Sequence, residues 1–288
     1  MKGNGLFQLL MMCMLGLSLD SCIYDQYPGR KQYALTVEYV DSLDRPLEDS
    51  VASLDSLNCF VNGIYQKALT KEPDGKYRYA FLEDSDIAFV AIDGKNPSEY
   101  TITPPFLGCS IHNSWLQMKL PIGEETPEPS PIFYGSVYTH LMSTSHENVF
   151  IKLKDIRAQV RVVANNILAK FGAGNYRVTL ENCCTGVAFD GTPCGPLASY
   201  EMPGKIYPDG NYRSISRYIL PTGEMPLRVK IYKEDGKLLF ESNTDVDGKP
   251  LLVKPGSNNV IIIQFYYTTE TTIKVVPFEE VGNETIFP

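Results

Sequence analysis

Cys22 is the residue whose surroundings specify a chemical reaction most clearly. It follows about 14 mostly apolar residues, from Leu6 to Leu19, which are too few for a membrane-spanning helix of roughly 20 but typical of a secretory signal peptide. Leu19, Ser21 and Cys22 fit a bacterial lipobox, in which a small residue precedes the cysteine and the thiol takes a diacylglycerol. The sequence therefore predicts that residues 1–21 are removed and that acyl chains on Cys22 hold the protein on a membrane. An ordinary signal peptide with a chance cysteine is the alternative.

Five cysteines remain after Cys22, and export places them where disulfides can persist: Cys59, Cys109, Cys183, Cys184 and Cys194. An odd number leaves at least one thiol unpaired or bonded to another chain. If the strand before them continues in register, Cys184 points inward and Cys183 outward. Cys194 follows a Gly-rich turn, so we expect a disulfide between Cys194 and one of that pair, with Cys184 preferred. Zinc is the alternative, but the cluster has no CxxC and no nearby histidine.

The other polar residues give no pattern for catalysis, a metal or a cofactor. His140 and His146 do not have the spacing of an HExxH pair and are interpreted as surface loop residues. Neither GxSxG nor GxGxxG occurs, and no phosphate-binding GxxxxGK motif is present. Asp245 and Asp247 begin like a calcium loop, but the Glu that closes such a loop is absent, so a hairpin turn is the better interpretation. We expect a protein that is not an enzyme.

Charge and length narrow the class of protein further. The net charge of −8 argues against non-specific binding to nucleic acid. After Cys22 no apolar stretch reaches about 18 residues, so no further membrane span is expected. Removal of the signal peptide leaves 267 of the 288 residues, a length that suggests two domains.

The segments that position these residues alternate apolar and polar side chains, as half-buried strands do. The clearest of them are residues 33–40, 57–61, 149–162, 176–180 and 227–231. Tight turns occur at Asp74-Gly75 and Asp209-Gly210, in the similar strings PDGKYR and PDGNYR, and their spacing of 135 residues (209 − 74) hints at a duplicated domain. The sequence predicts an all-β protein with two tandem antiparallel β-sandwiches.

A stretch rich in Pro and Glu, residues 121–131, interrupts the alternation and is predicted to connect the two domains. This places the N-terminal sandwich at residues 33–120 and the C-terminal sandwich at residues 132–288. Residues 22–32 are left as a tether between the lipid and the first sandwich.

The string NNVIIIQFYYTTE near the C-terminus is apolar on both faces of a strand. Such a strand must be covered on both faces or pair with a partner. A second alternating strand follows it, and we predict that the region from Asn258 to about Phe278 engages a neighbouring subunit. The residues expected to take part are Val260, Ile262, Phe265, Tyr267, Ile273, Val275 and Phe278. The alternative is that both strands simply close the second sandwich.

Several of these motifs together resemble the fimbrillin-associated anchor family, the FimB-type subunits of Gram-negative fimbriae. The likeness lies in Cys22-Ile23 with the nearby Asp25, in YALTVEY, and in IFYGSVY followed by VFIKLKDIRAQVRVV. It continues in GNYRVTLENCCTGVAFDG and in the terminal IKVVPFEEV. The resemblance implies two transthyretin-like β-sandwiches and a role at the base of a surface fimbrium, where the lipid holds the filament to the outer membrane.

The same superfamily contains stalk subunits, in which a protease removes the first strand and a strand from the next subunit fills the groove by β-strand addition. Cleavage to free the strand at residues 33–40 would have to follow Arg45, the first basic residue beyond it, but Pro46 blocks most Arg-specific proteases. This favours a subunit that keeps its first strand and its lipid.

The sequence therefore predicts a lipid-anchored, surface-exposed outer-membrane lipoprotein that acts as a fimbrial anchor or assembly subunit and binds other fimbrial subunits by strand addition. A surface glycan-binding lipoprotein is the first alternative, although Trp115 is the only tryptophan that could form an aromatic platform. A fimbrial tip adhesin and a secreted hydrolase with a carboxylate pair are the others.

Overall fold

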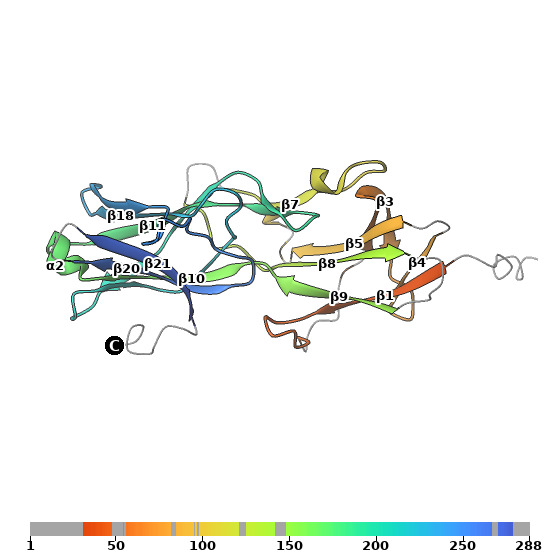
Figure 1. Cartoon of the computed structure of the whole chain (residues 1–288), viewed down its shortest axis with the longest axis horizontal. Coiled ribbons are helices and arrows are strands. Elements are labelled where there is room, and N and C mark those ends of the chain that lie inside the picture. Colours follow the sequence, from red (N-terminus) through yellow and green to blue (C-terminus); the bar gives the residue numbers. More distant parts are fainter. Residues whose placement is uncertain are drawn as a thin grey trace, which may run out of the picture.

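The structure is a computed structural model that describes residues 31–47, 54, 56–81, 85–94, 96, 98–120, 125–141, 148–266 and 270–278. The predicted signal peptide, Cys22, His146 and Tyr267 lie outside these residues. Almost all regular structure in the described residues is strand, which confirms the all-β prediction. Figure 1 shows two sandwiches placed end to end along the long axis of the molecule, with β7 between them and α2 at the far end of the second.

One seven-stranded sheet folds over to make the first sandwich. Its order is β3-β2-β5-β8-β9-β1-β4, formed by Ile64–Thr70, Ser56–Val61, Ser85–Gly94, Ile132–Leu141, Asn148–Asp155, Lys31–Tyr39 and Tyr77–Phe81. Strands β8 and β9 pair only where Phe133 and Tyr134 meet Asp155 and Lys154, so the sheet separates there into two layers. A shared core with side chains such as Leu35, Phe89 and Ile151 fills the space between the layers.

The second sandwich consists of two separate sheets. The first has the order β15-β16-β10-β20-β21, with β17 also on β10, and contains Gly204–Ile206, Tyr212–Ser214, Ala158–Asn165, Asn258–Phe265, Thr271–Pro277 and Arg217–Ile219. The second has the order β14-β11-β18-β19 and contains Ala198–Glu201, Tyr176–Cys183, Arg228–Lys233 and Leu238–Ser242. The helix α2, Ile167–Phe171, follows β10 and closes one end of the core.

The two sandwiches share a pattern that supports the duplication suggested by the repeated turn. Strand β1 is parallel to β9 and antiparallel to β4, and β10 is likewise parallel to β20 and antiparallel to β16. Each PDG turn leads into the corresponding antiparallel strand, β4 or β16, with Gly75 and Gly210 at φ of 83° and 80°. In both turns the Asp forms an ion pair with the Arg four residues on, Arg78 or Arg213.

A third, small sheet joins the two sandwiches at the waist. Its order is β13-β12-β7-β6, formed by Pro193–Cys194, Gly186–Ala188, Trp115–Met118 and Tyr100–Thr103, with the short 3-10 helix η1, Ile111–Asn113, just before β7. Leu116, Ile132 and Val187 are buried in a common cluster under this sheet. Phe189 packs on the outer face of the first sandwich with Phe60 and Val90. Backbone pairing and a buried apolar cluster therefore fix the two halves together.

The predicted boundary at residues 121–131 does not separate the two sandwiches. Strand β8 pairs with β5 over ten residues and β9 pairs with β1, so residues 132–155 belong to the first sandwich rather than the second. The described part of the Pro-rich segment is also bound in place, because Arg217 donates to Thr126 O at 3.2 Å and Arg157 donates to Pro129 O at 2.9 Å. Pro-rich composition alone does not show whether a segment crosses between domains or lies along one.

Candidate subunit-binding edge

Strand β20 contains the apolar run that the sequence singled out, and the protein itself covers both of its faces. Ile261, Ile263 and Phe265 are buried in the core of the second sandwich. Val260 is buried on the opposite face with Val163, and Ile262, Val276 and Phe278 pack against them. Both edges are also occupied, because β20 pairs in parallel with β10 and antiparallel with β21. The two strands therefore form the hairpin of the alternative interpretation, which leaves β21 as the strand at the edge.

Two observations show which backbone groups of β21 point away from β20. The N–H of Val246 donates to the carbonyl of Ile273 at 3.0 Å from the side opposite β20. In an antiparallel ladder the residues alternate between those that bond the partner strand and those that face outward, so Thr271, Val275 and Pro277 face outward as Ile273 does. Pro277 fits this pattern, since it has no N–H to offer to β20.

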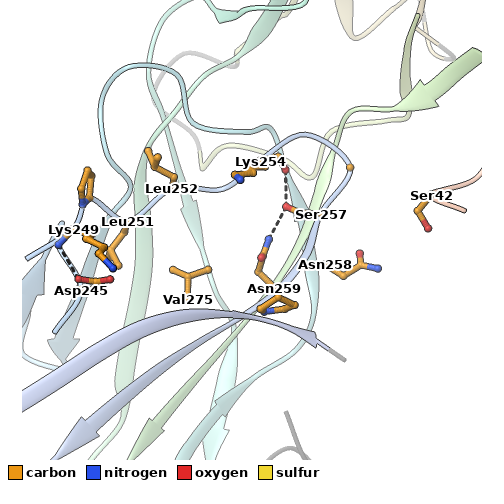
Figure 2. Close-up of a pocket in the computed structure, with 13 residues that line it drawn as sticks. Ser42, Asp245, Lys249, Leu251, Leu252, Lys254, Ser257, Asn258, Asn259 and Val275 are labelled. Atoms are coloured by element: carbon orange, nitrogen blue, oxygen red, sulfur yellow. Dashed lines mark hydrogen bonds between the residues drawn. The ribbon is translucent and has the colours of Figure 1, made fainter. Parts of the chain in front are cut away.

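Val275 is one of these outward-facing residues, so its N–H and C=O point away from β20, and no described residue forms a hydrogen bond with either group. A cavity of about 530 Å³ lies beside it. Figure 2 shows Val275 on one side of this cavity and the segment with Leu251, Leu252 and Lys254 across from it. The cavity has polar side chains at its end, where Asn259 Nδ2 donates to Ser257 Oγ at 2.7 Å and Ser257 donates to Lys254 O at 2.6 Å.

A second cavity, of about 620 Å³, continues from the first along the waist. The two share Ser42, Gly256 and Asn258 as lining residues. The wall of the second cavity carries an organised ion pair: Arg157 binds Asp155 at 2.7 Å and lies over the ring of Tyr218 at 4.1 Å from its centre. Together the cavities form a groove, here called the waist groove, that runs from the loop after β1 to the edge of β21.

The first strand is firmly part of the structure. Tyr33, Leu35 and Tyr39 of β1 are buried in the first core, between β4 and β9. The chain then turns so that Val40 bridges to Pro46. Asp41 binds the Arg45 guanidinium at 2.6 Å, and the backbone N–H of Arg45 at 2.9 Å helps to hold the pKa of this carboxyl below its usual value. The bond after Arg45, which would have to be cut to free the first strand, therefore lies in a closed turn.

All five described cysteines are free thiols, so the predicted Cys184–Cys194 disulfide is absent from the structure. The faces assigned to the pair were also wrong, because Cys183 is buried in the second core. A bulge between Glu181 and Cys183, with Asn182 at a φ of 67°, shifts the alternation by one residue and reverses the two faces. Cys184 instead packs against Gly223, where a Cβ would lie 3.0 Å from its Sγ.

The two described histidines each bind an aspartate rather than each other. His112 Nδ1 lies 2.6 Å from Asp190 Oδ2, and His140 Nδ1 lies 2.6 Å from Asp86 Oδ1. Within the described ranges, no three His, Cys, Asp or Glu side chains are arranged to hold a metal ion. The same part of the chain contains no helix with the length and apolar character needed to cross a membrane.

Comparison with known proteins links this architecture to solved structures, while no family profile and no curated protein sequence matches the chain. A candidate polysaccharide-binding protein from Bacteroides thetaiotaomicron has 16% identity and a TM-score of 0.55, over 88% of this chain and 99% of the other. The fimbrial anchor protein Mfa2 from Porphyromonas gingivalis has 14% identity and a TM-score of 0.55, over 86% and 98%. A candidate adhesin from Bacteroides ovatus has 11% identity and a TM-score of 0.51, over 89% and 95%. The chain therefore has the same fold, along almost its whole length, as a fimbrial anchor protein and two proteins described as polysaccharide-binding or adhesive.

Proposed function

We propose that this protein is an outer-membrane lipoprotein that anchors or assembles a fimbrium without catalysis, and that it binds another fimbrial subunit at the edge of β21. The shared fold with the fimbrial anchor of P. gingivalis supports the class of protein. The lipobox around Cys22 supports the lipid attachment. The closed turn at Arg45 and Pro46 supports an anchor that keeps its first strand instead of a stalk subunit that loses it.

The outward-facing backbone of Val275 beside the waist groove is the observation that carries this proposal. An extended segment of a partner could bond to Val275 and to the carbonyl of Pro277 while its side chains enter the cavity against Leu251 and Leu252. Val246 occupies the carbonyl of Ile273, so added pairing would run from Val275 toward the end of the strand. Main-chain bonds would provide affinity, and the alternate side chains would fix the register.

The test is to replace Val275 by Pro, with Val275→Ala as the matched control. Proline removes the outward N–H without removing a hydrogen bond to β20, and edge strands tolerate it at such a position. The alanine control accounts for the loss of the valine side chain. We expect co-purification of fimbrial subunits from detergent-solubilised membranes to fall at least tenfold for Val275→Pro and to stay within about twofold of wild type for Val275→Ala, since a tenfold loss corresponds to about 1.4 kcal/mol. A circular dichroism melt should show both variants folded. Full retention of the subunits by a folded Val275→Pro protein would rule out binding at this edge.

A further inference from the structure

The outer face of β8 carries a row of polar and aromatic side chains on the first sandwich. Tyr134, Ser136, Tyr138 and His140 alternate along the strand and share this face. The register with β5 places Ala88 opposite Tyr138 and Asp86 opposite His140. Because Ala88 is small, the large ring beside it is left uncovered, and Tyr138 is 61% exposed.

The same face of β8 carries a second tyrosine, Tyr134, four residues before Tyr138. The Tyr134 hydroxyl donates to the carbonyl of Phe189 at 3.2 Å. Tyr138 is the exposed tyrosine of the two and presents an aromatic surface to solvent.

A cavity of about 350 Å³ opens beside this ring. Its lining includes Gly63, Ala88 and Ile111 on the side of β5 and η1, and Tyr138 and His140 on the side of β8. Ala88 and Ile111 are buried in the cluster beneath it, so the floor is apolar. Its volume lies within the range of small-molecule sites, about 300–1,000 Å³.

Two histidine–aspartate pairs provide the polar groups of this face. His140 is oriented by Asp86 at 2.6 Å at the edge of the cavity, and both side chains remain more than 60% exposed. His112, next to Ile111, is oriented by Asp190 at 2.6 Å. Carboxylates accept strong hydrogen bonds from hydroxyl groups. Two carboxylates also disfavour an anionic ligand.

We propose that this cavity binds a neutral saccharide, with the C–H face of one pyranose ring stacked on Tyr138 and its hydroxyl groups bonded to Asp86 and His140. An aromatic face, an apolar floor and a few convergent polar groups suit a molecule that is apolar on the faces of its ring and polar around its edge. This site lies on the first sandwich, whereas the proposed subunit-binding edge lies on the second. Saccharide binding is therefore a separate activity from subunit assembly.

The test uses the full chain in detergent and a panel of neutral methyl glycosides, those of glucose, galactose, mannose and N-acetylglucosamine, with saturation-transfer NMR as the readout. We expect ring protons of at least one glycoside to receive saturation. Tyr138→Ala should weaken binding at least tenfold, whereas Tyr138→Phe, which keeps the stacking surface, should stay within about threefold of wild type. Phe150→Ala is the matched control, because Phe150 is equally exposed, at 60%, but lies on β9 in the other layer.

The panel and the variants make the outcome decisive. No transfer to any of the four glycosides would overturn the proposal. Binding that survives Tyr138→Ala, or that Phe150→Ala reduces to the same degree, would overturn it as well, because the ligand would then lie elsewhere on the protein. Neither result depends on Val275, so failure here is distinguishable from failure of the subunit-binding proposal.

Discussion

At the scale of single residues, burial controls the cysteine chemistry. Loss of hydration raises the pKa of Cys59 to about 12 and that of Cys194 to about 11. A raised pKa leaves less thiolate at a given pH, and the thiolate is the reactive form. Cys194 is the informative case, because it is only half-buried and an alkylating reagent can reach it more readily than the others.

We expect the native protein at pH 8 to react with iodoacetamide at Cys194 about a hundredfold more slowly than a free cysteine with an ordinary pKa near 8.5. Denaturation should then allow rapid labelling of all five thiols without any reductant. Peptide mass spectrometry measures both rates. A Cys194 peptide that is labelled only after reduction would show a disulfide instead.

A second residue-scale prediction concerns the bond after Arg45. Trypsin should not cut the wild-type protein there, because Pro46 follows the arginine and because Asp41 holds the turn closed. Pro46→Ala removes the first obstacle but not the second, so we expect slow cleavage in the folded protein and at least tenfold faster cleavage when Asp41→Ala is added. Gel analysis with N-terminal sequencing identifies the site. Equal cleavage of the single and double variants would show that the Asp41 contact does not protect the bond.

At the scale of elements, the pairing of β7 with β12 is one of the contacts that join the two halves. Gly186 of β12 lies so close to β7 that a Cβ there would meet the carbonyl oxygen of Leu116 at 2.4 Å. A backbone carbonyl cannot move away as a flexible side chain can. The glycine is therefore required by the close approach of the two strands, and its backbone φ is not in the left-handed region.

Gly186→Ala should destabilise the protein by about 1–3 kcal/mol, the usual cost of overpacking a well-packed site. For a protein of this size we expect the melting temperature to fall by several degrees, at roughly 2–4 °C per kcal/mol. Ser199→Ala on the exposed face of β14 is the control and should change stability by less than about 0.5 kcal/mol. An unchanged melting temperature for Gly186→Ala would show that the small sheet β13-β12-β7-β6 tolerates separation of β7 and β12.

At the scale of the whole molecule, the proposed membrane attachment can be tested at Cys22, which lies outside the described part of the chain. We expect Cys22→Ala to move the protein from the outer-membrane fraction to the soluble fraction, because no other lipid attachment is predicted from the sequence. Fractionation with immunoblotting measures the distribution, and mass spectrometry measures the acyl chains on the wild type. Ser18→Ala, inside the signal peptide and just outside the lipobox, is the control and should remain membrane-bound. Outer-membrane partition of Cys22→Ala with wild-type acyl mass would contradict the lipobox.

Local sequence patterns were sufficient to predict many of the strands and turns. The strict alternation in segments such as residues 33–40 and 176–180 predicted strands, because a strand with one buried face places every second side chain in the core. The two PDG turns were predicted from the need for a positive φ, which Gly75 and Gly210 both show. The argument from Arg45 and Pro46 also needed only adjacent residues. In each case the physical cause acts over a few positions of the chain.

The tertiary structure decided the features that depend on contacts between segments far apart in the sequence. The sequence by itself determined that the chain is all-β and that an apolar strand lies near its end, but only the fold assigned β8 and β9 to the first sandwich, since β5 and β1 are their hydrogen-bonding partners. One bulge at Asn182 reversed the faces of Cys183 and Cys184. The pairs His140–Asp86 and His112–Asp190, like the groove beside Val275, join segments that no local spacing connects. A period of two residues fixes which side chains share a face, whereas long-range burial and backbone pairing fix what that face meets.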